Sequence, residues 1–158
     1  MSIAHKDLRI DPDAVYSKTN EWMRADGDFI TVGITDYAQA AMRGMDADEH
    51  LQSVYVLGSF KVGDRIDIFD VIGEVHSSKT SSDIYSPMSG EIIAINGAKE
   101  HGVHLVPVED VENDPYGKGW LIRVKVDMTK GPNCAPMFPA KEYAVRSAKE
   151  YADHYGAC

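Results

Sequence analysis

One lysine stands among small hydroxyl side chains in the run "HSSKTSS", residues 76–82. Runs typical of strands flank it on both sides, so Lys79 is predicted to lie at the tip of a hairpin. A lysine amine sits on a flexible stem, and enzymes can acylate it when a protruding turn presents it. An exposed lysine also discourages strand edges from pairing, which is the simpler interpretation of its position alone. The rest of the chain decides between a solvated charge and a modification site.

Histidines and cysteines are the other candidates for chemistry. His101 and His104 are three residues apart and, with His76, could meet a metal ion. No carboxylate or cysteine completes a recognisable zinc motif, which favours ordinary polar histidines. Cys134 and Cys158 are too few for a disulfide framework and are expected to be inert. Because the chain has no Ser-His-Asp order and no phosphate-binding loop, we expect it not to be an enzyme.

The composition predicts one globular domain that binds neither nucleic acid nor membrane. With 158 residues and 44% apolar composition, the chain can bury one ordinary core, which we assign to residues 1–128. Residues 129–158 are expected to form a linker and a C-terminal helix packed on the same domain. The net charge of −9 disfavours contacts with phosphates. No apolar run approaches the ~20 residues of a membrane span, and the N-terminus lacks a secretory signal pattern, so we expect a cytoplasmic protein.

Many short strands and little helical pattern predict a mainly β fold. Residues 21–35 are expected to form a hairpin that turns at Asp26-Gly27, and residues 36–43 a helix capped by Thr35 or Asp36. Further strands are expected at 53–58, 64–76, 83–88, 90–96 and 119–127. Residues 46–52 are expected to be a surface insertion or a helix extension. Residues 96–119 are expected to form a long loop that contains a short extended or helical piece at 105–111. Residues 139–155 are expected to form an amphipathic helix that begins at Pro139. These elements indicate a flattened antiparallel β-sandwich or barrel with a short helix in the N-terminal half and a C-terminal helix.

Four stretches, in the same order along the chain, resemble one family of carrier proteins. They are "YSKTNEWMR" (16–24), "VGITDYAQ" (32–39), "SSKTSSDIYSPMSGEI" (77–92) and "NDPYGKGWLI" (113–122). From about Tyr16 to Val126 the chain resembles the H proteins of the glycine cleavage system, which are lipoyl carriers with the biotinyl/lipoyl attachment (barrel-sandwich hybrid) fold. The resemblance implies that lipoate is attached covalently to Lys79. Biotin is disfavoured, because Ser78 and Thr80 stand where biotinylated proteins usually have methionines beside the lysine.

The residues around Lys79 have expected roles at the attachment site. Small hydroxyl groups keep the tip hydrophilic and sterically open, and Gly73 and Gly90 allow turn or bulge geometry at the base of the hairpin. Asp83 is expected to be a solvated acid or to dock a basic ligase surface. The candidate cofactor-site residues that flank Lys79 are His76, Ser77, Ser78, Thr80, Ser81 and Asp83.

Departures from the family pattern bear on the pathway. His76 and Thr80 stand where H proteins usually have glutamate and alanine, and the loop at 99–112 is longer. These departures favour the H-like lipoate-binding proteins of microbial sulfur oxidation, which serve a heterodisulfide reductase-like complex. The alternative is a glycine cleavage H protein, which carries an aminomethyl group from glycine decarboxylase to the aminomethyltransferase. A third interpretation is an unmodified interaction module with the same fold.

Either carrier function implies further partners. A lipoate-protein ligase or lipoyl transferase would attach the lipoyl group, and dihydrolipoamide dehydrogenase would reoxidise it.

A thiol of Cys134 or Cys158 that exchanges with the dihydrolipoyl arm is the alternative to inert cysteines.

Overall fold

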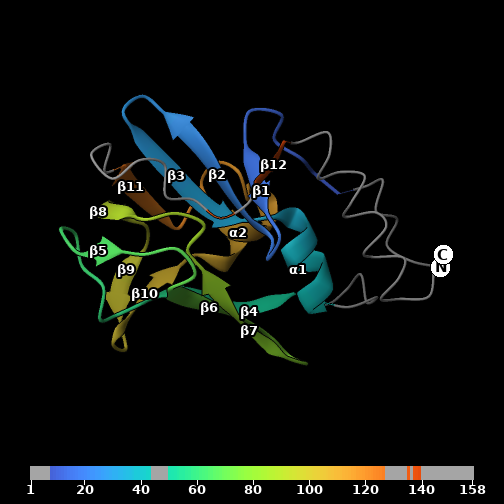
Figure 1. Cartoon of the computed structure of the whole chain (residues 1–158). Helices are drawn as coiled ribbons and strands as arrows, with labels where there is room; N and C mark the ends of the chain where they lie inside the picture. The colour runs from blue at the N-terminus through green and yellow to red at the C-terminus, as the bar shows by residue number, and fades with distance from the viewer. Residues whose placement is uncertain (1–7, 44–49, 127–134, 136, 140–158) are drawn as a thin grey trace.

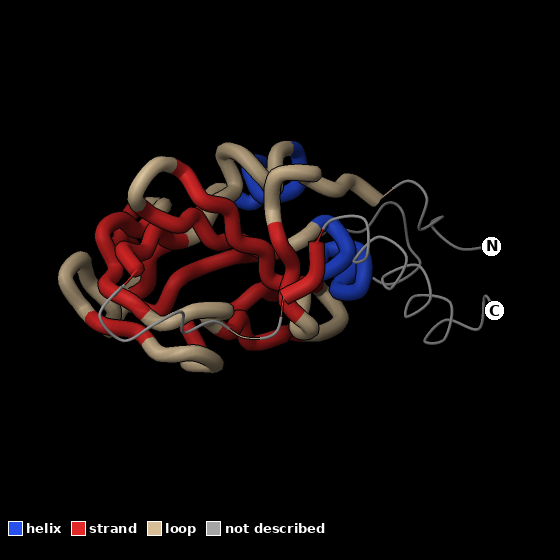
Figure 2. Tube along the Cα trace, turned by 45° about the horizontal axis from the view of Figure 1, so that its top comes forward, coloured by secondary structure: helices blue, strands red, loops and turns tan. Residues whose placement is uncertain are grey.

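The computed structural model arranges the chain as two antiparallel β-sheets that face each other (Figure 1). It describes residues 8–43, 50–126, 135 and 137–139. In spatial order, the described strands of sheet A are β12 (Met137–Pro139), β1 (Val15–Ser17), β2 (Glu21–Asp26), β3 (Phe29–Ile34), β11 (Ile122–Val126), β8 (Gly90–Ile95) and β5 (Arg65–Ile66). Those of sheet B are β7 (Ser81–Tyr85), β6 (Val71–Ser77), β4 (Leu51–Leu57), β10 (Val103–Val106) and β9 (Ala98–Glu100). Two described helices, α1 (Asp36–Arg43) and α2 (Val108–Asn113), lie at the margin of the strands (Figure 2).

The first hairpin and helix form as their sequence predicts. β2 and β3 pair from Glu21–Ile34 to Asp26–Phe29, and Gly27 in the turn has φ +73°, which glycine adopts without strain. α1 follows directly, and Oγ1 of Thr35 accepts a hydrogen bond of 3.0 Å from the Ala38 amide. Thr35 is therefore the residue that caps the helix through its side chain.

The run predicted as one strand at 64–76 is broken into β5 and β6. Residues 67–70 form a turn closed by a 3.1 Å hydrogen bond from the Asp70 amide to the Asp67 carbonyl, and Phe69 within it has φ +69°. Apolar alternation does not indicate such a turn when the sequence has no glycine there. The break lets β5 pair in sheet A while β6 pairs in sheet B.

The segment predicted as a long loop, residues 96–119, contains regular structure. β9 and β10 form a hairpin that turns at His101 (φ +53°) and Gly102 (φ +80°), and α2 follows. The piece at 105–111, left open as extended or helical, is strand up to Val106 and helix from Val108. Pro107 separates the two, because it has no amide hydrogen and its ring holds φ at −57°.

The hydrophobic core lies between the two sheets and extends under α1. Its fully buried members come from both sheets and include Val32, Val54, Val56, Ile66, Ile72, Ile92, Ile122 and Val124. A second cluster of buried residues packs beside α1: Ala14, Tyr16, Trp22, Tyr37 and Ala40. Nε1 of Trp22 donates hydrogen bonds of 3.1 Å to the carbonyls of Ile34 and Pro115. These hydrogen bonds connect β2 to the end of β3 and to the loop that follows α2.

The predicted linker and C-terminal helix lie almost entirely outside the described residues. Met137–Pro139 form β12, which pairs with β1, and the Ala135 amide donates a 2.7 Å hydrogen bond to the Pro87 carbonyl. Pro139, which was predicted to begin the helix, is the last residue of β12. The helix itself, Cys134 and Cys158 lie outside the described residues.

Candidate functional site

β6 and β7 form a hairpin that projects from the lower sheet in Figure 1 and carries Lys79 at its tip. His76 pairs with Ser81, and beyond this pair the Ser77 amide donates a 2.9 Å hydrogen bond to the Thr80 carbonyl. The two tip residues are Ser78 and Lys79, and both are exposed. The predicted place of Lys79 at a hairpin tip is confirmed, while its modification stays a prediction.

Ser77 fixes the turn from beneath. Only 6% of the residue is exposed, and its Oγ donates a 2.8 Å hydrogen bond to the Met42 carbonyl in the last turn of α1. The same oxygen accepts hydrogen bonds of 3.3 Å from the amides of Lys79 and Thr80. The last carbonyls of a helix have no partner within the helix, so Ser77 supplies one. Ser77 was predicted to flank the attachment site and help keep the tip hydrophilic and open, but it is a buried link between the tip and α1.

His76 belongs to a polar cluster on the face of sheet B that points away from the core. Its Nε2 lies 2.9 Å from Oε1 of Glu74 and 3.2 Å from the Tyr55 hydroxyl. The rings of His76 and Tyr55 stack with centroids 5.6 Å apart. Burial raises the pKa of Tyr55, and the carboxylates of Glu74 and Asp83 raise it further. His76 is thus held by neighbouring strands beside the tip.

The remaining flanking residues, Ser78, Thr80, Ser81 and Asp83, are exposed along the hairpin. Asp83 lies directly across from Glu74 in the β6–β7 pair. At the base of the hairpin the register shifts between Val71 and Gly73, which is the irregularity predicted there. A Cβ at Gly73 would lie 2.1 Å from the Tyr55 carbonyl oxygen, so this position requires glycine.

A pocket of about 110 Å³ opens beside β7, between the two sheets and α1. Its lining combines polar groups of β7 and the β1–β2 turn with apolar groups of α1 and includes Thr19, Glu21, Ala41, Met42, Ser82 and Asp83. Ser82 and Asp83 follow Lys79 by three and four residues, which places the pocket roughly 10–13 Å along the chain from the lysine backbone. Sequence reasoning missed the pocket, because residues 19–21 meet the hairpin only through the packing of the two sheets.

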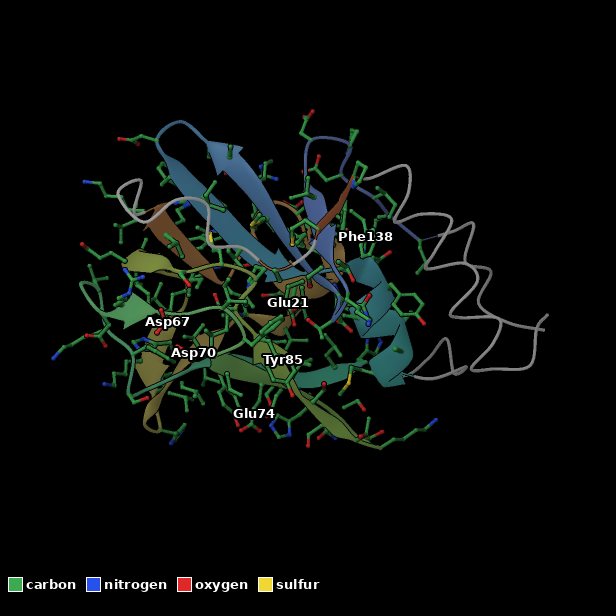
Figure 3. The ribbon with its side chains drawn as sticks, in the orientation of Figure 1. Glu21, Asp67, Asp70, Glu74, Tyr85 and Phe138 are labelled. Carbon is green, nitrogen blue, oxygen red and sulfur yellow. The ribbon has the colours of Figure 1, made fainter. Side chains whose placement is uncertain are left out.

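Glu21 places a buried carboxylate in this pocket, with 2% of the residue exposed. Its Oε1 accepts hydrogen bonds from the hydroxyls of Ser17 (2.8 Å) and Thr19. Its Oε2 accepts one of 3.1 Å from the Tyr85 amide at the end of β7, and Figure 3 shows the two residues side by side. Burial raises the pKa of Glu21, and these hydrogen bonds oppose the shift. The contact joins sheet A to the hairpin strand of sheet B.

The histidines considered for a metal site have separate surroundings. His76 contacts Glu74 and Tyr55, His101 lies in the β9–β10 turn, and Nε2 of His104 lies 2.9 Å from the Phe60 carbonyl. Within residues 8–43, 50–126, 135 and 137–139, no three His, Cys, Asp or Glu side chains are grouped as a metal site.

In the same part of the chain, no helix has the length and apolar character needed to cross a membrane.

Two facing antiparallel sheets that display a lysine at the tip of a projecting hairpin define a carrier domain of the biotinyl/lipoyl attachment type. Residues 14–150 match the family model described as glycine cleavage H-protein, and the chain therefore belongs to this family.

Individual relatives cover most of the chain. It is 38% identical over 141 residues to the glycine cleavage system H protein of Rubrobacter xylanophilus, which spans 89% of this chain and 97% of that one. It is 40% identical over 118 residues to the H protein of Thermus thermophilus, with 75% and 81% covered. The crystal structure of the H protein from Mycobacterium marinum superposes with a TM-score of 0.59 at 29% identity, covering 93% of this chain and 99% of that one.

Family membership confirms the resemblance inferred from the four stretches, the mainly β carrier fold, and the expectation that the chain is not itself an enzyme. The named relatives are glycine cleavage proteins, so the comparisons favour the pathway that was the alternative prediction. The preferred sulfur-oxidation pathway, inferred from His76 and Thr80, has no support from them. The contacts of His76 with Glu74 and Tyr55 offer a local structural reason for a histidine there.

Proposed function

We propose that this chain carries lipoate on Lys79 and serves as the H protein of a glycine cleavage system. The observation that carries the proposal is the exposed tip, whose turn Ser77 holds against α1. A ligase can reach an amine there without disturbing the core, and the fixed turn keeps the amine clear of the sheets. Lys79 would hold the lipoyl group, and its dithiolane would supply an acceptor for the aminomethyl group derived from glycine.

The pocket beside β7 supports the same function. A lipoyl-lysine side chain has roughly a dozen bonds and extends on the order of 15 Å, so its end can fold back over the 10–13 Å to the pocket. Glu21, Asp83 and Thr19 would attract an ammonium group at that end, because carboxylates and hydroxyls accept charge-assisted hydrogen bonds. Ala41 and Met42 would cover its hydrocarbon part. We infer that these residues hold the loaded end away from water between visits to partner enzymes.

Four protein partners follow from this proposal. A lipoate-protein ligase or lipoyl transferase acylates Lys79. Glycine decarboxylase loads the arm, the aminomethyltransferase unloads it, and dihydrolipoamide dehydrogenase reoxidises the dithiol. The exposed polar residues of the hairpin, including Ser81 and Asp83, are the surface that the ligase meets first.

Intact-mass measurement after incubation with ligase, lipoate and ATP tests the attachment site. The wild type should gain one lipoyl-sized increment, and Lys79→Arg, which keeps the charge, should gain none. Lys99→Arg is the matched control, because Lys99 is an exposed strand lysine on the same sheet and its loss should leave the increment intact. An increment that survives Lys79→Arg refutes the site, and an unmodified wild type favours the interaction module.

Reconstitution tests the pathway. The lipoylated protein should support glycine-dependent release of carbon dioxide by glycine decarboxylase and onward transfer by the aminomethyltransferase. Failure in that assay together with turnover by a heterodisulfide reductase-like complex would show that sulfur oxidation is the correct pathway.

A further inference from the structure

The loop between β5 and β6 holds an aromatic residue in a conformation that glycine prefers. Phe69 is the third residue of the turn Asp67–Asp70 and has φ +69°. The third position of a type II turn is typically glycine, because a Cβ there crowds the backbone. Asn20 and His101 also have positive φ, but asparagine and histidine adopt this region more readily than a bulky apolar residue does.

Hydrogen bonds from the segment after β7 lock this turn. The Phe69 amide donates to the Ser86 carbonyl and the Ser86 amide donates to the Asp70 carbonyl, both at 2.8 Å. Oγ of Ser89 accepts a 3.0 Å hydrogen bond from the Ile68 amide. Ser86 and Ser89 are themselves buried. Phe69 therefore cannot relax to negative φ without breaking bonds within the protein.

Burial does not compensate Phe69 for this conformation, since 58% of the residue is exposed. An isolated exposed apolar side chain is ordinary in folded proteins. An exposed aromatic ring on a strained and locked backbone is unusual, because neither burial in the core nor the turn geometry favours phenylalanine at this position. Strain of this kind is concentrated at sites where a protein binds something.

The charges beside the ring indicate the chemistry of the partner. Figure 3 shows Asp67 and Asp70 on this turn, and both are exposed. Arg65 lies 3.5 Å from Asp67 and offsets its charge, whereas Asp70 contributes to the net charge of −9. A complementary surface has an apolar pocket for the ring and a lysine or arginine at its rim beside Asp70.

We propose that Phe69 is a docking anchor for glycine decarboxylase, the enzyme that loads the lipoyl arm on Lys79. This enzyme receives the ring in an apolar pocket rimmed by at least one basic side chain. The proposal rests on the carrier function proposed above. The seven residues of β6 separate the turn from the hairpin tip by roughly 23 Å. An anchor at this distance holds the carrier while Lys79 remains clear to enter the active site. Aromatic anchors of this kind contribute a large share of interface affinity.

The test is the KM of glycine decarboxylase for the lipoylated carrier and its variants. Phe69→Gly removes the ring and relieves the strain, so KM should rise about tenfold with kcat nearly unchanged, while Tm rises by about 2–4 °C. Phe69→Tyr keeps the ring and should stay within about twofold of wild type. Val62→Ala is the matched control, because Val62 is another exposed apolar residue at 59% and has no positive φ.

Asp70→Asn keeps an acceptor for the Asp67 amide but removes the charge. It should raise KM about threefold at low salt and have no effect at high salt, since salt screens exposed charges. An unchanged KM for Phe69→Gly, or an equal rise for Val62→Ala, refutes the anchor while wild-type turnover upholds the carrier function. A wild-type carrier that the decarboxylase does not use at all overturns the proposed function and the anchor together.

Discussion

Replacement of Ser77 by alanine should loosen the tip that presents Lys79. The hydroxyl donates one 2.8 Å hydrogen bond to the Met42 carbonyl and accepts two of 3.3 Å from the Lys79 and Thr80 amides. Loss of the short bond costs about 1 kcal/mol, and the buried carbonyl left without it costs about 1 kcal/mol more. The two long bonds are weaker and only partly buried, so they add at most about 1 kcal/mol. The expected total is about 2–3 kcal/mol.

Two assays measure the effect of Ser77→Ala, one on the stability of the fold and one on the rate of lipoylation. Urea denaturation should show a free energy of unfolding about 2–3 kcal/mol lower than wild type, with an unchanged m-value. The initial rate of lipoylation should fall about threefold to tenfold, because the ligase then meets the proper turn in only a fraction of molecules. Hydrogen exchange at the Lys79 and Thr80 amides should accelerate, since both lose their acceptor.

Ser81→Ala provides the matched control. Ser81 is an exposed serine on the same hairpin, and its replacement should change stability by less than about 0.5 kcal/mol. If Ser77→Ala behaved like Ser81→Ala in both assays, the buried hydroxyl would not hold the tip and the structural argument would be wrong.

Three further changes probe the site and the scaffold. Burial raises the folded-state pKa of Glu21 above its ordinary value of 4.5, so the folded protein binds the carboxyl proton more tightly than the unfolded chain does. The free energy of unfolding should therefore fall as pH rises from about 4.5 through the raised pKa. Urea titrations of Glu21→Gln across this range should show a flatter pH dependence. Burial likewise raises the pKa of Tyr16 to about 12, so stability should decline from about pH 10 to 12, and ultraviolet titration should find a late-ionising tyrosine that Tyr16→Phe removes. Gly73→Ala would place a Cβ 2.1 Å from the Tyr55 carbonyl oxygen and should cost about 3 kcal/mol in urea denaturation, and a loss below about 1 kcal/mol would contradict the close approach of β4 and β6.

Local signals account for the parts of the fold that were predicted correctly. The Asp-Gly turn of the β2–β3 hairpin, the threonine cap of α1 and the polar run around Lys79 each depend on residues close together in the chain. The break between β5 and β6 was missed because its turn uses Phe69 where glycine is usual, and bonds from Ser86 hold it there. The β9–β10 hairpin was missed because His101 supplies a positive φ that a sequence pattern does not reveal.

The candidate site divides in the same way. Lys79 was recognisable from its polar surroundings and from the family resemblance, because an attachment turn must be exposed and small side chains keep it so. The sequence placed Glu21 in a family motif and Ser77 among the serines of the hairpin, but it did not predict the role of either residue. Their roles depend on contacts with Tyr85 and with Met42, which lie far from them in the chain.

The sequence alone was enough to predict the mainly β class, the hairpin that carries Lys79 and membership in a family of carriers, since each depends on short-range patterns or on motifs in a fixed order. The packing of the two sheets sets the contacts of the site: Ser77 is buried under the tip, Glu21 lies in the pocket beside β7, and His76 contacts Glu74 and Tyr55. The same packing leaves Phe69 exposed at the end of β6 that lies away from the lysine. The physical reason is that burial and hydrogen bonding between sheets depend on how the strands pair and pack, and many sequences with the same local pattern are compatible with different packing.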